Sequence, residues 1–221
     1  MAPSLHDILA SLSAAYGPEP RSAAAAPFEA LIEAVLGQNS NRKNVERVVE
    51  NLREAGVLDA QRLHALPDDE LEELMRPAGH SRLKVRRLRN LLALLIERYD
   101  GSPEQMFAAG LETLRGELLE INGIGPETAD SILLYAGKLP SFVVDMNVQR
   151  VLKRHGLLDY FADSEQIKGE VESSLEPDAA LYQEFHALLE RVGEEHCRKT
   201  PKCDGCPLED LLPEGGPLEP P

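Results

Sequence analysis

A helical repeat of apolar residues runs through most of this chain and limits what it can fold into. In "VRRLRNLLALLIERY", residues 85–99, apolar side chains recur every three to four residues while the arginines lie mostly off that stripe. This spacing places one apolar face along a helix. Similar patterns recur along the sequence, and no segment alternates apolar and polar residues as a half-buried strand does. We therefore predict an all-α fold.

Length and composition set further bounds. A chain of 221 residues, 43% of them hydrophobic, can bury a core as one large domain or as two small lobes. Its apolar runs are shorter than the roughly 20 residues that span a membrane. The N-terminus carries His6 and Asp7 and does not resemble a signal peptide. We expect a cytoplasmic, nucleoid-associated protein, and we expect residues 212–221, rich in proline and glycine, to be disordered.

The charge is unevenly distributed. A formal net charge of −15 argues against a nucleic-acid partner, since binding phosphates needs cations. However, residues 76–98 contain seven Lys or Arg and one acid, whereas residues 159–195 contain eleven acids and two basic residues. Taken alone, the basic run is a solvated helix face. It also leaves room for a local positive patch on an acidic protein.

The segment "ELLEINGIGPETADSILLYAG", residues 117–137, predicts a helix, a hairpin and a second helix. Gly123 and Gly125 allow a tight turn and leave backbone N–H groups uncovered, and Pro126 suits the start of a helix. Such N–H groups bind an anion such as phosphate without a lysine. A glycine C-cap followed by a new helix is the alternative. Two glycines around one apolar residue favour the DNA-binding interpretation.

A carboxylate follows this hairpin, in "SFVVDMNVQRVLKRHG". Asp145 directly precedes a predicted helix, and aspartate is a good N-cap. Taken alone, the residue is best explained as that cap. A cap can also be a catalyst, because it fixes a carboxylate at the start of a helix.

These motifs together carry a family resemblance. "INGIGPETADSILLYA" followed by "VVDMNVQRV" resembles the helix-hairpin-helix, Gly/Pro-rich loop and aspartate signature of the endonuclease III-like (HhH-GPD) superfamily of DNA glycosylases. "AVLGQNSNRKNVERVVENL" resembles the first helix pair of that family, and "RPAGHSRLKVRRL" the segment before its basic helix. The likeness runs from about residue 27 to 206. The hairpin wording is similar to the branch containing bacterial 3-methyladenine DNA glycosylases.

The resemblance implies a two-lobed all-α fold with a DNA-binding cleft between the lobes. A helical barrel would span residues 22–134, and residues 1–21 with 135–211 would form the second lobe. The implied partner is double-stranded DNA with a damaged base flipped out of the helix, bound by a monomer. The resemblance assigns Gln38 as the residue that wedges into the duplex. The other implied DNA contacts are Asn39, Lys84, Arg86, Gly123, Ile124, Gly125 and Thr128.

The resemblance also assigns chemistry. Asp145 would stabilise the oxocarbenium-like transition state as the glycosidic bond breaks. Glu127 stands where the bifunctional lyases carry a nucleophilic lysine, and a glutamate cannot form a Schiff base. We therefore predict a monofunctional glycosylase that acts on an alkylated purine and leaves an abasic site. The alternatives are a bifunctional endonuclease III-type enzyme acting on oxidised pyrimidines and a catalytically inactive DNA-binding module.

An alkylated base is cationic, so an aromatic cage would suit it. The sequence does not rank the candidate aromatic residues, and residues of this kind are more often plain core: Tyr16, Phe28, Tyr135 and Phe142. His80 stands where relatives often carry an aromatic residue.

The cysteines are clustered in "CRKTPKCDGCPLEDLL", which resembles the iron–sulfur loop of the family. Cys197, Cys203 and Cys206 would be ligands, but Leu212 occupies the place of the expected fourth cysteine. A [4Fe–4S] cluster is normally held by four thiolates. A cluster here would therefore need an atypical ligand, with His196, Asp204 and Asp210 as candidates. Three free thiols in a surface loop are the alternative.

Overall fold

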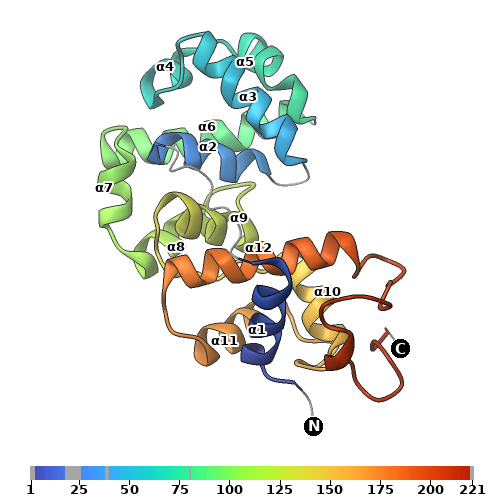
Figure 1. Cartoon of the computed structure of the whole chain (residues 1–221). Helices are drawn as coiled ribbons and strands as arrows, with labels where there is room; N and C mark the ends of the chain where they lie inside the picture. Colours follow the sequence, from blue (N-terminus) through green and yellow to red (C-terminus); the bar gives the residue numbers. More distant parts are fainter. Residues whose placement is uncertain (1–2, 18–25, 38–39, 80, 220–221) are drawn as a thin grey trace. The chain divides into compact units, whose positions relative to one another are not determined.

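The computed structural model describes residues 3–17, 26–37, 40–79 and 81–219 (Figure 1). Over these residues the chain is helical and forms no strand, only an isolated bridge between Cys197 and Pro201. The predicted all-α class is confirmed. None of the helices in the described part is long and apolar enough to cross a membrane. Gln38, Asn39 and His80 lie outside the described residues.

The chain divides into two compact units. One joins Met1–Arg21 to Pro140–Pro221, and the other is Ser22–Leu139. The sequence placed the boundary after residue 134, but the structure places it after residue 139. The π-helical turn Ile132–Ala136 packs into the core of the Ser22–Leu139 unit through Ile132, Leu133 and Ala136, which keeps the segment in that unit.

The Ser22–Leu139 unit is built around α6, Ser81–Tyr99. The apolar stripe predicted on this helix is its buried face, with Val85, Leu88, Leu91, Leu92 and Leu95 at most 5% exposed. Burial of this face provides most of the driving force for helix packing. The other helices of the unit are α2 (Pro27–Gly37), α3 (Arg42–Glu54), α4 (Ala60–Ala65), α5 (Asp68–Met75), α7 (Pro103–Ala108), α8 (Leu111–Leu119) and α9 (Pro126–Ser131), with a 3₁₀ turn, η1, at Arg76–Ala78.

The second unit is organised by α12, Ala179–Glu195, which packs against α1 (Leu5–Tyr16) and α10 (Met146–Arg154) (Figure 1). It also contains α11 (Ser164–Ser174) and the 3₁₀ turn η3 (Glu209–Leu211). Aspartates begin three of these helices, because their side chains accept hydrogen bonds from backbone N–H groups that have no partner within the helix. These N-caps are Asp145, Asp163 and Asp178.

The C-terminal tail, expected to be disordered, makes specific contacts over its described residues. The backbone N–H of Leu218 donates to the Arg154 carbonyl at 3.0 Å, and Arg154 pairs with the Glu219 carboxylate at 3.0 Å. The Arg154 side chain is buried, and Arg154 is 65 residues from Glu219 in the sequence. Composition alone does not reveal such a partner, which is why the expectation was wrong for residues 212–219.

Candidate functional site

The predicted hairpin lies between α8 and α9. Gly123 has φ +96°, a conformation that side chains with a Cβ rarely adopt. A Cβ at this position would also lie 2.7 Å from Cγ of Arg87. Ile124 is 4% exposed and anchors the turn in the core. Gly123 is exposed and has no side chain, so its backbone is presented outward.

The start of α9 carries no side-chain cap. Gly125 is the N-cap residue and Pro126 follows it, so no side chain covers the first backbone N–H groups of the helix. Thr128 was expected to contact DNA through this turn, but its side chain is 3% exposed. Burial of the residue argues against a contact between the Thr128 hydroxyl and DNA.

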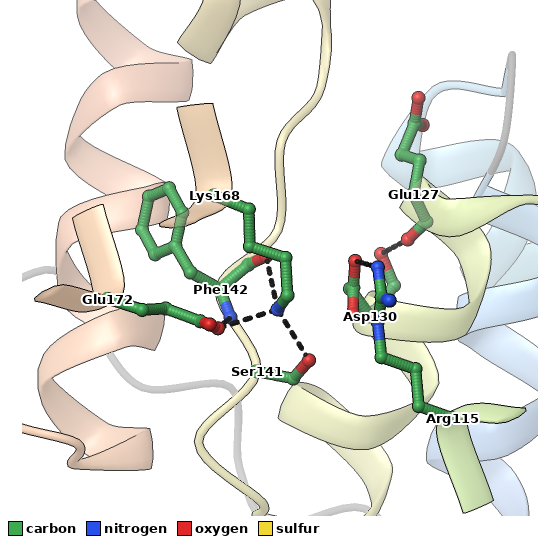
Figure 2. A network of polar contacts seen from close by, with 8 residues as sticks. Arg115, Glu127, Asp130, Ser141, Phe142, Lys168 and Glu172 are labelled. Atoms are coloured by element: carbon green, nitrogen blue, oxygen red, sulfur yellow. Dashed lines mark hydrogen bonds and ion pairs between the residues drawn. The ribbon is translucent and has the colours of Figure 1, made fainter. Parts of the chain in front are cut away.

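A buried ion pair fastens the two helices of the hairpin. Arg115 on α8 donates to both carboxylate oxygens of Asp130 on α9, at 2.8 and 3.2 Å (Figure 2). Asp130 is 2% exposed, and two parallel hydrogen bonds fix the relative orientation of both groups. The side chain of Glu127 extends away from this pair (Figure 2). This ion pair thus holds α8 and α9 in a fixed relative orientation.

The basic residues of α6 serve different purposes. Lys84 was expected to bind DNA, but it is 2% exposed, and its amine donates to the carbonyls of Leu36 at 3.0 Å and Ala78 at 2.9 Å and to the Ser40 hydroxyl. Burial lowers the pKa of this amine. The prediction for Lys84 is wrong, because the residue fastens the end of α2 and the η1 turn to α6. Arg86 is exposed, as binding to DNA would require.

Asp145 is the N-cap of α10, as the sequence predicted. Its Oδ1 accepts the Val148 N–H at 2.7 Å, and its side chain is 16% exposed. The three residues before it, Phe142, Val143 and Val144, are at most 5% exposed. A buried extended segment therefore delivers a partly exposed carboxylate to the start of a helix.

A lysine on α11 holds that segment in place. The amine of Lys168 donates to the Ser141 hydroxyl at 2.7 Å and to the Phe142 carbonyl at 3.3 Å, and it pairs with Glu172 at 2.6 Å (Figure 2). Glu172 in turn accepts the Phe142 N–H at 2.8 Å. We did not predict this cluster from the sequence. The signal available for it was the four-residue spacing of Lys168 and Glu172 on a helix.

A second group missed from the sequence lies at Asp145 itself. Nε2 of His186 is 4.0 Å from Oδ2 of Asp145, and Nδ1 of His186 is 3.5 Å from Glu190. His186 is buried, whereas the Glu190 side chain is 46% exposed. Both residues belong to α12, which packs on α10. The Asp145 carboxylate thus has one oxygen fixed by the helix start and the other beside an imidazole.

Beside the first turn of α10 is an open hollow of about 430 Å³, lined partly by basic side chains. Gly193 allows α12 to approach here, since a Cβ would lie 2.8 Å from Cβ of Asn147. The hollow lies in the same unit as Asp145 and offers three cationic groups. Its lining residues are Asn147, Arg150, Gly193, Glu194, Arg198 and Lys199.

The cysteine loop encloses a small cavity of about 10 Å³, lined by all three thiols. Leu212 lines it too, and a leucine cannot ligate iron. Among the candidate substitute ligands, His196 lines the cavity, whereas Asp204 and Asp210 are exposed on the loop. The donor groups that line the cavity are therefore the three thiols, the imidazoles of His155 and His196 and the Glu209 carboxylate, a set that fits an iron–sulfur cluster in its thiols.

The protonation of the thiols and the hydrogen bonds that hold the cysteine loop both affect whether a cluster could bind. Burial raises the pKa of the Cys203 and Cys206 thiols, and the neighbouring thiol groups add to this, so a bound cation would be needed to stabilise the thiolates. Arg154 donates to the Arg198 and Lys199 carbonyls and to the Cys197 sulfur, the last at 3.5 Å. These bonds brace the loop independently of any metal.

The candidate cage residues are mostly structural. Phe142 is fully buried and packs edge-on against Tyr182, with ring centroids 5.7 Å apart. Tyr16 lies under the Arg191 guanidinium, 4.1 Å from the ring centroid. Phe28 packs against the core of the other unit and Tyr135 is half-buried. Phe142 is therefore a core residue.

Comparison with known proteins gives a consistent result. The pattern of the HhH-GPD superfamily of base excision DNA repair proteins matches residues 32–177. The chain is 41% identical over 186 residues to a Methanocaldococcus jannaschii protein named as a DNA repair glycosylase, covering 83% of this chain and 84% of that one. It is 28% identical over 198 residues to Bacillus subtilis endonuclease III, covering 86% and 82% of the two chains.

Solved structures are similar over most of their length. A non-covalent endonuclease III–DNA complex matches with a TM-score of 0.79 and 27% identity, covering 96% of this chain and 94% of that chain. A 3-methyladenine DNA glycosylase from H. pylori bound to 1,N6-ethenoadenine matches with a TM-score of 0.77 and 26% identity, covering 87% and 98%. The region matched by the superfamily pattern, residues 32–177, includes both the hairpin and the Asp145 segment.

Proposed function

The chain belongs to the HhH-GPD superfamily of base excision DNA repair proteins, and from that premise we propose that this DNA glycosylase is monofunctional. It hydrolyses the N-glycosidic bond of a damaged nucleotide that is flipped out of double-stranded DNA. The product is an abasic site in an unbroken strand.

The observation that carries this proposal is the setting of Asp145. Its Oδ1 is held by the Val148 N–H, so the carboxylate has a fixed orientation, and its side chain remains 16% exposed. As the bond between C1′ and the base breaks, the electron pair leaves with the base and the sugar becomes positively charged. A preorganised anion beside that sugar stabilises the charge without reorganising. Water then attacks C1′.

The absence of lyase activity follows from Glu127. Strand cleavage by this family's route needs an amine that forms a Schiff base with the sugar, and a carboxylate cannot do so. Two other amines, those of Lys84 and Lys168, are buried and hydrogen-bonded to protein acceptors. Lys138 follows the π-helical turn Ile132–Ala136, more than two helical turns from Glu127 along the chain, and is a poor substitute.

An alkylated purine is the proposed substrate. The similarity to the H. pylori 3-methyladenine DNA glycosylase supports it. A cationic alkylated base is a good leaving group, so a site whose assigned catalytic group is a single carboxylate suits this chemistry. The endonuclease III relatives favour a second candidate, excision of oxidised pyrimidines with strand cleavage. Glu127 argues against the cleavage step of that alternative.

DNA binding would use backbone dipoles together with a few cations. The uncapped start of α9 and the outward backbone of Gly123 provide N–H groups for a phosphate. Arg150, Arg198 and Lys199, in the hollow beside α10, would bind further phosphates. Such local contacts explain how a chain of net charge −15 binds a polyanion. Gln38 and Asn39, as the resemblance implies, would contact the gap in the duplex.

We also propose that an iron–sulfur cluster is held by Cys197, Cys203 and Cys206, with His196 as the fourth ligand. Nδ1 of His196 lies 3.2 Å from the Lys202 carbonyl, so Nε2 is the nitrogen assigned to the metal. A bound cluster would stabilise the thiolates and the loop. It would take no part in breaking the glycosidic bond.

The test is incubation of the wild-type protein with duplexes carrying 3-methyladenine, 1,N6-ethenoadenine, uracil or an oxidised pyrimidine. Base release is scored after alkali treatment and strand nicking without it. We expect release of an alkylated purine and no nicking before alkali. Nicking without alkali, together with a covalent complex trapped by borohydride, would contradict the monofunctional assignment. No release from any duplex would support the inactive DNA-binding module.

A further inference from the structure

His186 lies between two carboxylates, one of them the proposed catalytic group. Its Nε2 is 4.0 Å from Oδ2 of Asp145, and its Nδ1 is 3.5 Å from Oε2 of Glu190. Side-chain exposure is 16% for Asp145, 6% for His186 and 46% for Glu190. A buried imidazole thus connects a carboxylate at the site to a carboxylate that reaches solvent.

The fold fixes this arrangement. His186 and Glu190 are four residues apart on α12 and therefore share one face of the helix. The Phe142 ring meets the His186 ring edge-on, with centroids 6.4 Å apart and an interplanar angle of 79°. The carboxylates that face the imidazole come from the start of α10 and from α12 itself. Helix α1, which also packs on α12, places Tyr16 against Arg191.

We propose that Glu190, His186 and Asp145 form a proton relay that serves hydrolysis, with His186 and Glu190 as positioning residues. This inference rests on the proposed catalytic role of Asp145. Because Oδ1 is occupied by the Val148 N–H, Oδ2 is the oxygen that can serve both the attacking water and the imidazole. A shift of about 1 Å brings Oδ2 and Nε2 to hydrogen-bonding distance, and such contacts commonly tighten when substrate binds.

The proton balance of the relay is complete. As the water oxygen bonds to C1′, one water proton passes to Oδ2 of Asp145, while the base has already left with the bonding electrons. That proton moves to Nε2 of neutral His186. The proton on Nδ1 moves to Glu190 and from there to solvent. Asp145 is again an anion and the next turnover can begin.

The test measures single-turnover base release from alkylated duplex DNA against pH, for wild type, His186→Asn, Glu190→Gln and the matched control Glu184→Gln. Glu184 is on the same helix and carries the same charge, but half a turn away from His186. We expect His186→Asn to lower the rate about 10- to 100-fold at pH 7, within the range of general acid–base effects. It should also change how the base-release rate depends on pH, because a step of proton transfer is lost.

Glu190→Gln should also change the pH profile, and Glu184→Gln should leave rate and profile unchanged. Thermal unfolding and affinity for a duplex containing a tetrahydrofuran abasic-site analogue show whether each variant is folded. A His186→Asn protein with the wild-type rate, or with a slower rate and the same pH profile, overturns the relay. If Asp145→Asn retains base release, the proposed function itself fails, which is a distinguishable result.

Discussion

The hairpin and the Asp145 segment both present backbone or side-chain groups at a helix start, but they are built differently. The hairpin depends on local features, since Gly123, Gly125 and Pro126 shape the turn within four residues. The Asp145 segment depends on distant side chains, with Lys168 and His186 reaching it from α11 and α12. The hairpin turn is therefore encoded locally, whereas the orientation of the Asp145 carboxylate requires the surrounding unit.

The largest effect that tests this contrast comes from Lys168→Met. The change leaves Glu172 and the Ser141 hydroxyl without their cationic partner, and breaking a buried ion pair costs about 3 kcal/mol or more. Glu172 is 30% exposed and can rehydrate, so we expect about 3 kcal/mol, measured by urea unfolding. The base-release rate should fall and DNA affinity should persist.

Lys202→Met, at an exposed position, is the matched control and should change stability little. Equal stability of the Lys168→Met and Lys202→Met variants would show that the Asp145 segment does not depend on α11.

A smaller effect is expected at the hairpin from Gly123→Ala. The positive φ costs about 1–2 kcal/mol for a residue with a Cβ, and the new Cβ must displace Arg87. Affinity for an abasic-site duplex should weaken, measured by fluorescence anisotropy. Gly110→Ala is the control, because Gly110 also has a positive φ but has open space around it. If both variants bind DNA equally well, the geometry of the hairpin turn does not determine binding to the DNA backbone.

The smallest effect is expected from Glu219→Gln at the C-terminal tail. The Glu219 side chain is 49% exposed, and exposed ion pairs contribute about 0–1 kcal/mol. We expect a loss of less than about 1 kcal/mol in urea unfolding and an unchanged base-release rate. A loss as large as that of Lys168→Met would mean that the tail is a structural part of its unit.

The sequence predicted what depends on local patterns. The α6 stripe, the glycine turn and the Asp145 N-cap could be predicted because each follows from spacing or backbone preference over a few residues. Lys84 was assigned wrongly because a lysine in a basic run looks solvated, and only the fold shows the carbonyls of Leu36 and Ala78 around its amine.

The remaining features depend on contacts between distant residues. The approach of His186 to Asp145 joins positions 41 residues apart, and the tail contact of Arg154 spans 65 residues. Neither leaves a periodic signal in the sequence. The i, i+4 pairs of α11 and α12 were visible, but such pairs usually lie on solvated helix faces and do not indicate which ones face a site.

The most direct test of the central claim compares wild type with Asp145→Asn on duplex DNA carrying an alkylated purine. The amide keeps an oxygen to accept the Val148 N–H, so the cap and the fold should persist, while the negative charge is lost. We expect base release to fall by about 10²–10³-fold or more, with affinity for the damaged duplex retained and no strand nicking before alkali by either protein. Base release by Asp145→Asn at the wild-type rate would contradict the account.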